Sequence, residues 1–102
     1  MAIQSTAVMA AGSTIYTSTG NSAVTVIYFC NNNATAVTAN IHLVPNGLSV
    51  NSNNIIYNTL DIASKDTYVL DTEKLIFDNG DQIVVVASAD NSLVATLTYV
   101  GI

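Results

Sequence analysis

The 102-residue sequence predicts an all-β protein, an antiparallel β-sandwich of jelly-roll-like form with seven to eight short strands. Three observations support this prediction. Apolar residues recur at every second position in several stretches, which is the spacing of a strand with one buried face. Asn, Gly, Asp and Pro residues that favour turns separate these stretches at short intervals. About eight such strands in roughly a hundred residues are typical of a sandwich or jelly roll.

The first half of the chain contains three candidate strands, at residues 14–17, 23–30 and 37–43. In residues 23–30 both alternating sets of side chains are largely apolar, as in a central strand that is covered on both faces. In residues 37–43 the apolar set alternates with polar residues, among them His42, which indicates one buried and one wet face. The turn sequence Pro45-Asn46-Gly47 ends this strand.

Further candidate strands follow at residues 54–60, 67–70, 74–77, 82–89 and 93–100. Asn79-Gly80 is the strongest two-residue hairpin signal, since a type I′ turn needs positive φ at both central positions. Residues 74–100 are therefore predicted to form a three-stranded meander. Residues 60–74 allow a single helical turn, but the β-branched and aromatic residues 67–69 favour a loop followed by a strand.

The sequence shows no internal repeat and no boundary within residues 14–102, so we predict one sandwich domain there. Residues 1–13 are rich in small side chains and are predicted to form an N-terminal arm that lies on a neighbouring molecule. Residues 47–54 form the longest polar stretch, and its apolar tip makes it a candidate contact loop, with a solvated connection as the alternative.

The charged residues are few and unevenly placed. None of the first sixty residues is Asp, Glu, Lys or Arg, and all nine charged residues lie between Asp61 and Asp90. A net charge of −5 with two cations, Lys65 and Lys74, excludes nucleic-acid binding by phosphate neutralisation and docking on anionic lipid.

The most apolar run is far shorter than the roughly twenty residues of a transmembrane helix. The first residues lack the positive region of a signal peptide, so we expect synthesis in a cytoplasm without general secretory export.

No constellation of ionisable residues indicates catalysis. His42, the only histidine, is interpreted as a polar strand residue rather than a catalytic base, and Cys30, the only cysteine, as a buried thiol. Residues 78–81 superficially resemble a calcium loop but lack the EF-hand spacing and its terminal Glu, so these carboxylates are expected to serve turns. We predict no catalytic residue, no cofactor-binding residue, no metal ligand and no enzymatic activity.

Uncharged strands with high β-propensity leave sheet edges that natural proteins usually cover. A homo-oligomer provides such cover, so assembly with further copies is predicted. Within the arm and the candidate contact loop, the residues expected at an interface are Ile3, Val8, Met9, Leu48, Val50 and Asn53.

Five segments carry a resemblance to a known family. They are TIYTS at 14–18, VTVIYFCNN at 24–32, HLVPNG at 42–47, LIFDNGDQI at 75–83 and YVGI at 99–102, with Ser88 before the last. In this order they resemble small β-sandwich virion proteins of tailed bacteriophages, including cyanophages. Such proteins are head decoration (cement) proteins or accessory pieces of tails and fibres. The resemblance implies a virion protein made in the host cytoplasm, without catalytic residues.

The expected function is therefore that of a non-enzymatic capsid decoration protein, a homotrimer that binds the major capsid protein and stabilises the head through capsomer contacts. One alternative is a tail, baseplate or fibre component that contacts tail proteins. A second is a carbohydrate-binding or receptor-binding module. The five tyrosines lie in or beside strands, where packing is their usual role, and the chain has no tryptophan, which weakens the second alternative.

Overall fold

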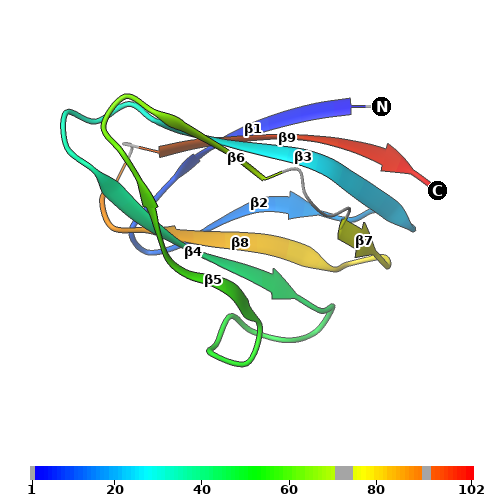
Figure 1. Ribbon diagram of the computed structural model, residues 1–102. Helices are drawn as coiled ribbons and strands as arrows, with labels where there is room; N and C mark the ends of the chain where they lie inside the picture. Colours follow the sequence, from blue (N-terminus) through cyan, green and yellow to red (C-terminus); the bar gives the residue numbers. More distant parts are fainter. Residues whose placement is uncertain (1, 71–74, 91–92) are drawn as a thin grey trace.

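The computed structural model describes residues 2–70, 75–90 and 93–102, which form two antiparallel β-sheets packed against each other (Figure 1). In chain order the strands are β1 (Ala2–Val8), β2 (Ser13–Thr17), β3 (Ser22–Asn31), β4 (Val37–Val44), β5 (Ile55–Ile62), β6 (Thr67–Leu70), β7 (Leu75–Phe77), β8 (Gln82–Ala87) and β9 (Leu93–Gly101). Sheet A has the order β1-β9-β3-β6, and β7 also pairs with β3. Sheet B has the order β2-β8-β4-β5. This part of the chain contains no helix long and apolar enough to cross a membrane.

The strand pairs are nested along the chain. β4 pairs with β5, β3 with β6 and β7, β2 with β8, and β1 with β9, all antiparallel. Successive pairs alternate between sheet B and sheet A, so the paired chain winds around the core. The predicted β-sandwich is confirmed, and the described residues contain nine strands where seven to eight are predicted.

One hydrophobic core fills the space between the inner faces of the two sheets. Its side chains are aliphatic and aromatic residues at alternate strand positions, as the period of two requires. The largest fully buried ones are Phe29, Ile15, Ile27, Ile41, Ile62, Ile83, Leu93 and Leu97. Burial of these side chains, each contributing about 1.5–3 kcal/mol relative to exposure, is the main source of stability.

A buried amide joins the two sheets at one end of this core. Asn31, at the end of β3, is fully buried, and its Nδ2 donates to the carbonyl oxygens of Thr35 (3.0 Å) and Ile62 (2.9 Å). Its Oδ1 accepts the backbone N–H of Asn33 at 2.8 Å. Since a buried polar group is tolerated only when it is hydrogen-bonded, these contacts fix where the chain leaves sheet A for sheet B.

The predicted domain organisation needs one correction at the N-terminus. Residues 2–8 of the predicted arm form β1, which pairs with β9 from Ala2↔Tyr99 to Val8↔Leu93. This stretch is an edge strand of the sandwich itself. Its inward positions include Gln4 and Thr6, so they interrupt the apolar period that would have indicated a strand.

The predicted meander over residues 74–100 is wrong. β7 pairs with β3 in sheet A, whereas β8 lies in sheet B and β9 returns to sheet A. Gly80 has φ +88°, but Asn79 lies outside the positive-φ region, so the turn is not of type I′. A bond from Asp81 N to Asp78 O (3.1 Å) with positive φ at the third residue is typical of a type II turn, which splays the flanking strands.

Candidate interaction surfaces

The two sheets differ in what lies on their outer faces. On sheet A, side chains that alternate with the core residues point away from sheet B. The strand register arranges them in rows across the sheet, and the central row is Ser5–Thr96–Tyr28–Val69. A second row holds Ala7–Val94–Cys30–Thr67, and further along lie Ile3–Thr98–Val26 and Val100–Ala23–Ile76. We call these residues the outer face of sheet A.

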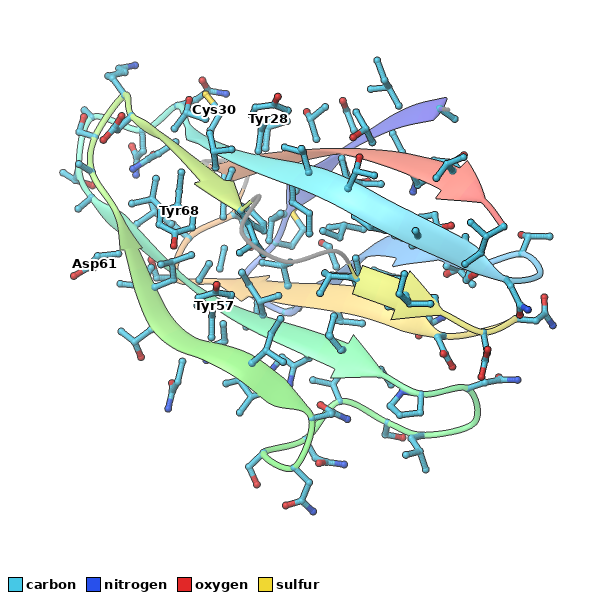
Figure 2. All side chains as sticks on the ribbon, turned by 45° about the vertical axis from the view of Figure 1, so that its right-hand side comes forward. Tyr28, Cys30, Tyr57, Asp61 and Tyr68 are labelled. Carbon is cyan, nitrogen blue, oxygen red and sulfur yellow. The ribbon has the colours of Figure 1, made fainter. Side chains whose placement is uncertain are left out.

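This outer face carries apolar and hydroxyl side chains, and several of the apolar ones are exposed to solvent. Ile3 and Ile76 have 72% and 64% of their surface exposed, and Tyr28 and Val69 have 41% and 42%. Figure 2 shows Tyr28 and Cys30 pointing away from the sandwich, while Tyr57 and Tyr68 point between the sheets. No strand of sheet A contains a charged residue within its described bounds.

The outer face of sheet B is covered in part by the chain itself. Residues 45–54, the β4–β5 loop, extend on the side of sheet B that faces away from sheet A (Figure 1). The loop starts with a turn in which Leu48 N donates to Pro45 O (3.1 Å), with φ +86° at Gly47. It ends where Leu43 N donates to Asn54 O at 3.0 Å, so both ends of the loop are tied to β4.

His42 anchors this loop. Its side chain lies on the outer face of sheet B, opposite Val84, yet only 6% of it is exposed. Nδ1 lies 3.1 Å from the carbonyl oxygen of Asn51 and 2.9 Å from Oδ1 of Asn54. A carbonyl oxygen can only accept, so Nδ1 carries the proton and donates to the loop. The face predicted to be wet at His42 is therefore covered, and the ring positions residues 51–54.

Asparagine side chains complete the loop. Asn54 Nδ2 donates to Ser49 O (2.9 Å), and Asn51 Oδ1 accepts the backbone N–H of Asn53 (2.7 Å). Two open hollows of about 370 and 460 Å³ flank the loop, one against Val84 and Val86 and one against Leu43 and Ile55. The loop therefore has a defined shape, with apolar and amide groups at its surface.

The predicted interface residues fall into three groups. Leu48, Val50 and Asn53 all lie exposed on the β4–β5 loop, and Leu48 has 61% of its surface exposed. Ile3 is exposed on the outer face of sheet A, and Met9, just after β1, is partly buried. The structure corrects the prediction for Val8. This last residue of β1 is fully buried in the core and offers no surface to a partner.

Three exposed apolar residues of sheet A escaped the sequence analysis: Tyr28, Val69 and Ile76. A signal for Tyr28 was present, because both alternating sets of residues 23–30 are apolar. That pattern predicts a strand covered on both faces. The described chain covers only the inner one.

The thiol and the tyrosines also differ in part from expectation. Cys30 is partly exposed rather than buried, with Sγ 3.7 Å from Asn32 Oδ1. Tyr16 is buried, with its hydroxyl 2.6 Å from Ser22 Oγ and its ring centroid 4.8 Å from that of Tyr99. Of the five tyrosines, Tyr28 is the most exposed, since Tyr57, Tyr68 and Tyr99 are partly buried.

Carboxylates at the ends of the sandwich hold turns together. Asp81 Oδ1 accepts the backbone N–H of Asn46 (2.9 Å) and Oδ2 that of Asp78 (2.9 Å), which joins the β4–β5 and β7–β8 connections. Gly80 lies against Asn46 so closely that a Cβ would come within 2.5 Å of its Cγ. Asp90 Oδ1 accepts Ala10 N at 2.7 Å in the same manner. The turn role predicted for residues 78–81 is confirmed at Asp81.

Residues 2–70, 75–90 and 93–102 contain no group of three or more His, Cys, Asp or Glu side chains that could hold a metal ion. Asp71, Glu73 and Lys74 lie outside the described residues.

Exposed apolar side chains of the described residues lie on the outer face of sheet A and on the β4–β5 loop, which are therefore the candidate surfaces. Comparison with protein-family models, with curated proteins and with solved structures finds no match to this chain.

Proposed function

We propose that this chain is a non-enzymatic structural protein of a phage virion, a decoration protein that binds the major capsid protein and stabilises the assembled head. It acts by burying uncharged surface against neighbouring subunits. Binding to the assembled state alone stabilises that state by mass action, as with any ligand of one state. A phage particle is proposed because residues 14–18, 24–32, 42–47, 75–83 and 99–102 resemble small phage virion proteins.

The observation that carries the proposal is the distribution of exposed apolar side chains. Leu48 and Val50 stand on a loop whose shape is held by His42 and by asparagine amides. A loop with fixed backbone loses little conformational entropy when it binds, which favours affinity. Leu48, Val50 and Asn53 are proposed to contact the capsid.

The order of the strands supports a jelly roll as the form of this sandwich. A jelly roll is a double sheet of eight strands built from two Greek keys. The nested pairs β4·β5, β3·β6/β7, β2·β8 and β1·β9, which alternate between the sheets, are compatible with that topology if β6 and β7 count as one interrupted strand. The same folding pattern suits a tail component, so location in the particle requires measurement.

The test is quantitative mass spectrometry of purified virions of the phage that encodes the chain, with copy number normalised to the major capsid protein. A ratio near one, or another large fraction, is expected for a decoration protein. A handful of copies per particle would assign the protein to the tail instead. Complete absence from the virion would overturn the proposal.

A second experiment tests the contact loop. The double variant Leu48→Asp/Val50→Asp is expected to lose binding to capsids that lack the protein, since two unpaired carboxylates would be desolvated at the contact. Ala36→Asp, at an exposed position beside the end of β4 opposite the loop, is the control that adds charge away from the loop. Equal binding of both variants would remove the loop from the proposed contact.

A carbohydrate-binding module, the remaining alternative, would rest on Tyr28, the exposed tyrosine. Sugar stacking on Tyr28 predicts binding on a glycan array that Tyr28→Ala abolishes. An array with no binding at all would count against this alternative.

A further inference from the structure

We propose that the outer face of sheet A binds a second copy of this chain through the same face, across a twofold axis. The inference goes beyond the proposed function, because it concerns the isolated protein and requires no virion. It names the surface and the symmetry of self-association.

The first argument is the pattern of β3. Its outward set, Val26, Tyr28 and Cys30, is largely apolar, like the inward set that packs in the core. Within the described residues nothing covers the outward set, and Tyr28 remains 41% exposed. On sheet B, by contrast, the outward residues His42 and Val84 are each 6% exposed, and His42 lies under the β4–β5 loop. A second molecule would provide for sheet A the cover that the loop provides for sheet B.

The second argument is the size of the face. β3 is ten residues long, which corresponds to roughly 33 Å at about 3.3 Å per residue. The other strands of sheet A are shorter, and the 33 residues of its described strands, at about 3.3 Å by about 4.8 Å each, give a projected area of roughly 520 Å². The accessible area exceeds the projection because side chains make the surface uneven. Specific interfaces bury about 600–1,000 Å² of accessible surface per partner, so a dimer at the lower end of this range would use nearly the whole face.

The third argument is charge, and it favours a second copy over a charged partner. The chain has a net charge of −5, so two copies repel each other through most surfaces. Described charges lie on β5 and in the connections, at Asp61, Lys65, Asp66, Asp78, Asp81 and Asp90. None of these described charges lies on the outer face of sheet A itself, and Asp66 and Asp78 stand just beyond the ends of β6 and β7, so two copies can meet there without a described carboxylate inside the contact. A charged partner would leave its own charges desolvated without counter-charges.

The fourth argument is self-complementarity. In the central row, Ser5 Oγ and Thr96 Oγ1 are 3.0 Å apart and satisfy each other, while Val69 is apolar and Tyr28 presents an aromatic ring with a hydroxyl at its edge. Polar groups that are already paired can enter an interface without a new partner. A twofold axis places the same side chains on both sides, which is the isologous contact of most homodimers. Two such sheets would pack about 10 Å apart.

The experiment compares two variants of matched position. Val69 lies on β6, an edge strand of sheet A, and Ile56 on β5, an edge strand of sheet B, and each has 42% of its surface exposed. Val69→Asp is expected to raise the dimer dissociation constant at least about a hundredfold in sedimentation velocity, because each dimer would bury two carboxylates. Ile56→Asp adds the same charge and is expected to dimerise like the unmodified chain.

Ile3→Asp is the second variant of the face, at a 72% exposed position where a carboxylate disturbs the fold least. It is expected to weaken the dimer in the same direction, and circular dichroism verifies that each variant is folded. A monomer at all concentrations overturns the proposal. So does a trimer, the symmetry that the phage resemblance favours, because a face that packs on itself yields pairs. Association that persists in Val69→Asp and Ile3→Asp would move the contact elsewhere, for example to the free edge of β1, and also overturns it.

Discussion

The outer faces of the two sheets make an informative comparison. Sheet B has a ten-residue loop over part of its outer face, held by the ring of His42 and the amides of Asn51 and Asn54. Sheet A has no such cover within the described residues, and Ile3, Ile76, Val69 and Tyr28 stand exposed on it. Both faces belong to one sandwich with one core. The difference is therefore that one face is covered in part by the chain itself, whereas the other stays exposed within the described residues and is the face that we propose a second copy covers.

The inner faces should not show this difference. Phe29 of sheet A and Ile41 of sheet B are both fully buried in the same cluster. Phe29→Ala is expected to cost about 3–5 kcal/mol of unfolding free energy and Ile41→Ala about 2–5 kcal/mol. Urea denaturation measures both. A cost below about 1 kcal/mol for either would mean that the two sheets do not share one core.

The outer faces should respond differently in the monomer. His42→Leu removes the donor to Asn51 O and leaves that acceptor without its partner, so we expect a loss of about 2 kcal/mol. Thr96→Val on sheet A breaks the exposed bond to Ser5 Oγ and is expected to stay within about 0.5 kcal/mol. Denaturation at a concentration where the chain is monomeric separates these values. Equal losses would show that the loop does not stabilise sheet B.

The charged residues at the ends of the sandwich provide a further comparison, because their carboxylates hold turns together and do not lie on the outer faces. Asp81→Ala removes the acceptor for Asn46 N and Asp78 N and should cost about 1–1.5 kcal/mol. Asp61→Ala, at an exposed carboxylate on β5, is the control and should change stability by less than about 0.5 kcal/mol. If both changes cost the same, net charge rather than the turn would be the cause.

Salt is expected to have the smallest effect. Since no described strand residue of sheet A is charged, the dimer dissociation constant should change by less than about threefold between roughly 0.05 and 0.5 M salt. Any change should tighten the dimer, because salt screens the repulsion between two chains of charge −5. A marked weakening with salt would indicate ion pairs at the contact instead.

The sequence predicted the sandwich and most strand positions because alternation and turn residues report burial directly. β6 was located at residues 67–70 as the structure has it. β1 escaped detection because Gln4 and Thr6 occupy inward positions, and its strand form depends on pairing with β9. The sheet to which β7 belongs depends on contacts with β3 that no local pattern reveals.

The candidate surfaces were predictable only in part. Leu48 and Val50 were identified because apolar residues in a polar loop are unusual. Val8 was predicted at an interface but is buried, because its position follows from the pairing of β1 with β9, which the sequence did not indicate. Periodicity in residues 23–30 revealed that both faces of β3 are apolar, but periodicity cannot say whether the cover is part of the same chain.

The most direct test of the central claim, that the outer face of sheet A is a binding surface, uses Cys30. This is the only cysteine of the chain, and it lies partly exposed in the row Ala7–Val94–Cys30–Thr67 of that face. The measurement is the rate of Cys30 alkylation as a function of protein concentration. We expect the rate to fall at least about tenfold as the dimer forms in the unmodified chain and in Ile56→Asp, and to stay constant in Val69→Asp. A rate that is independent of concentration while the chain associates would contradict the account.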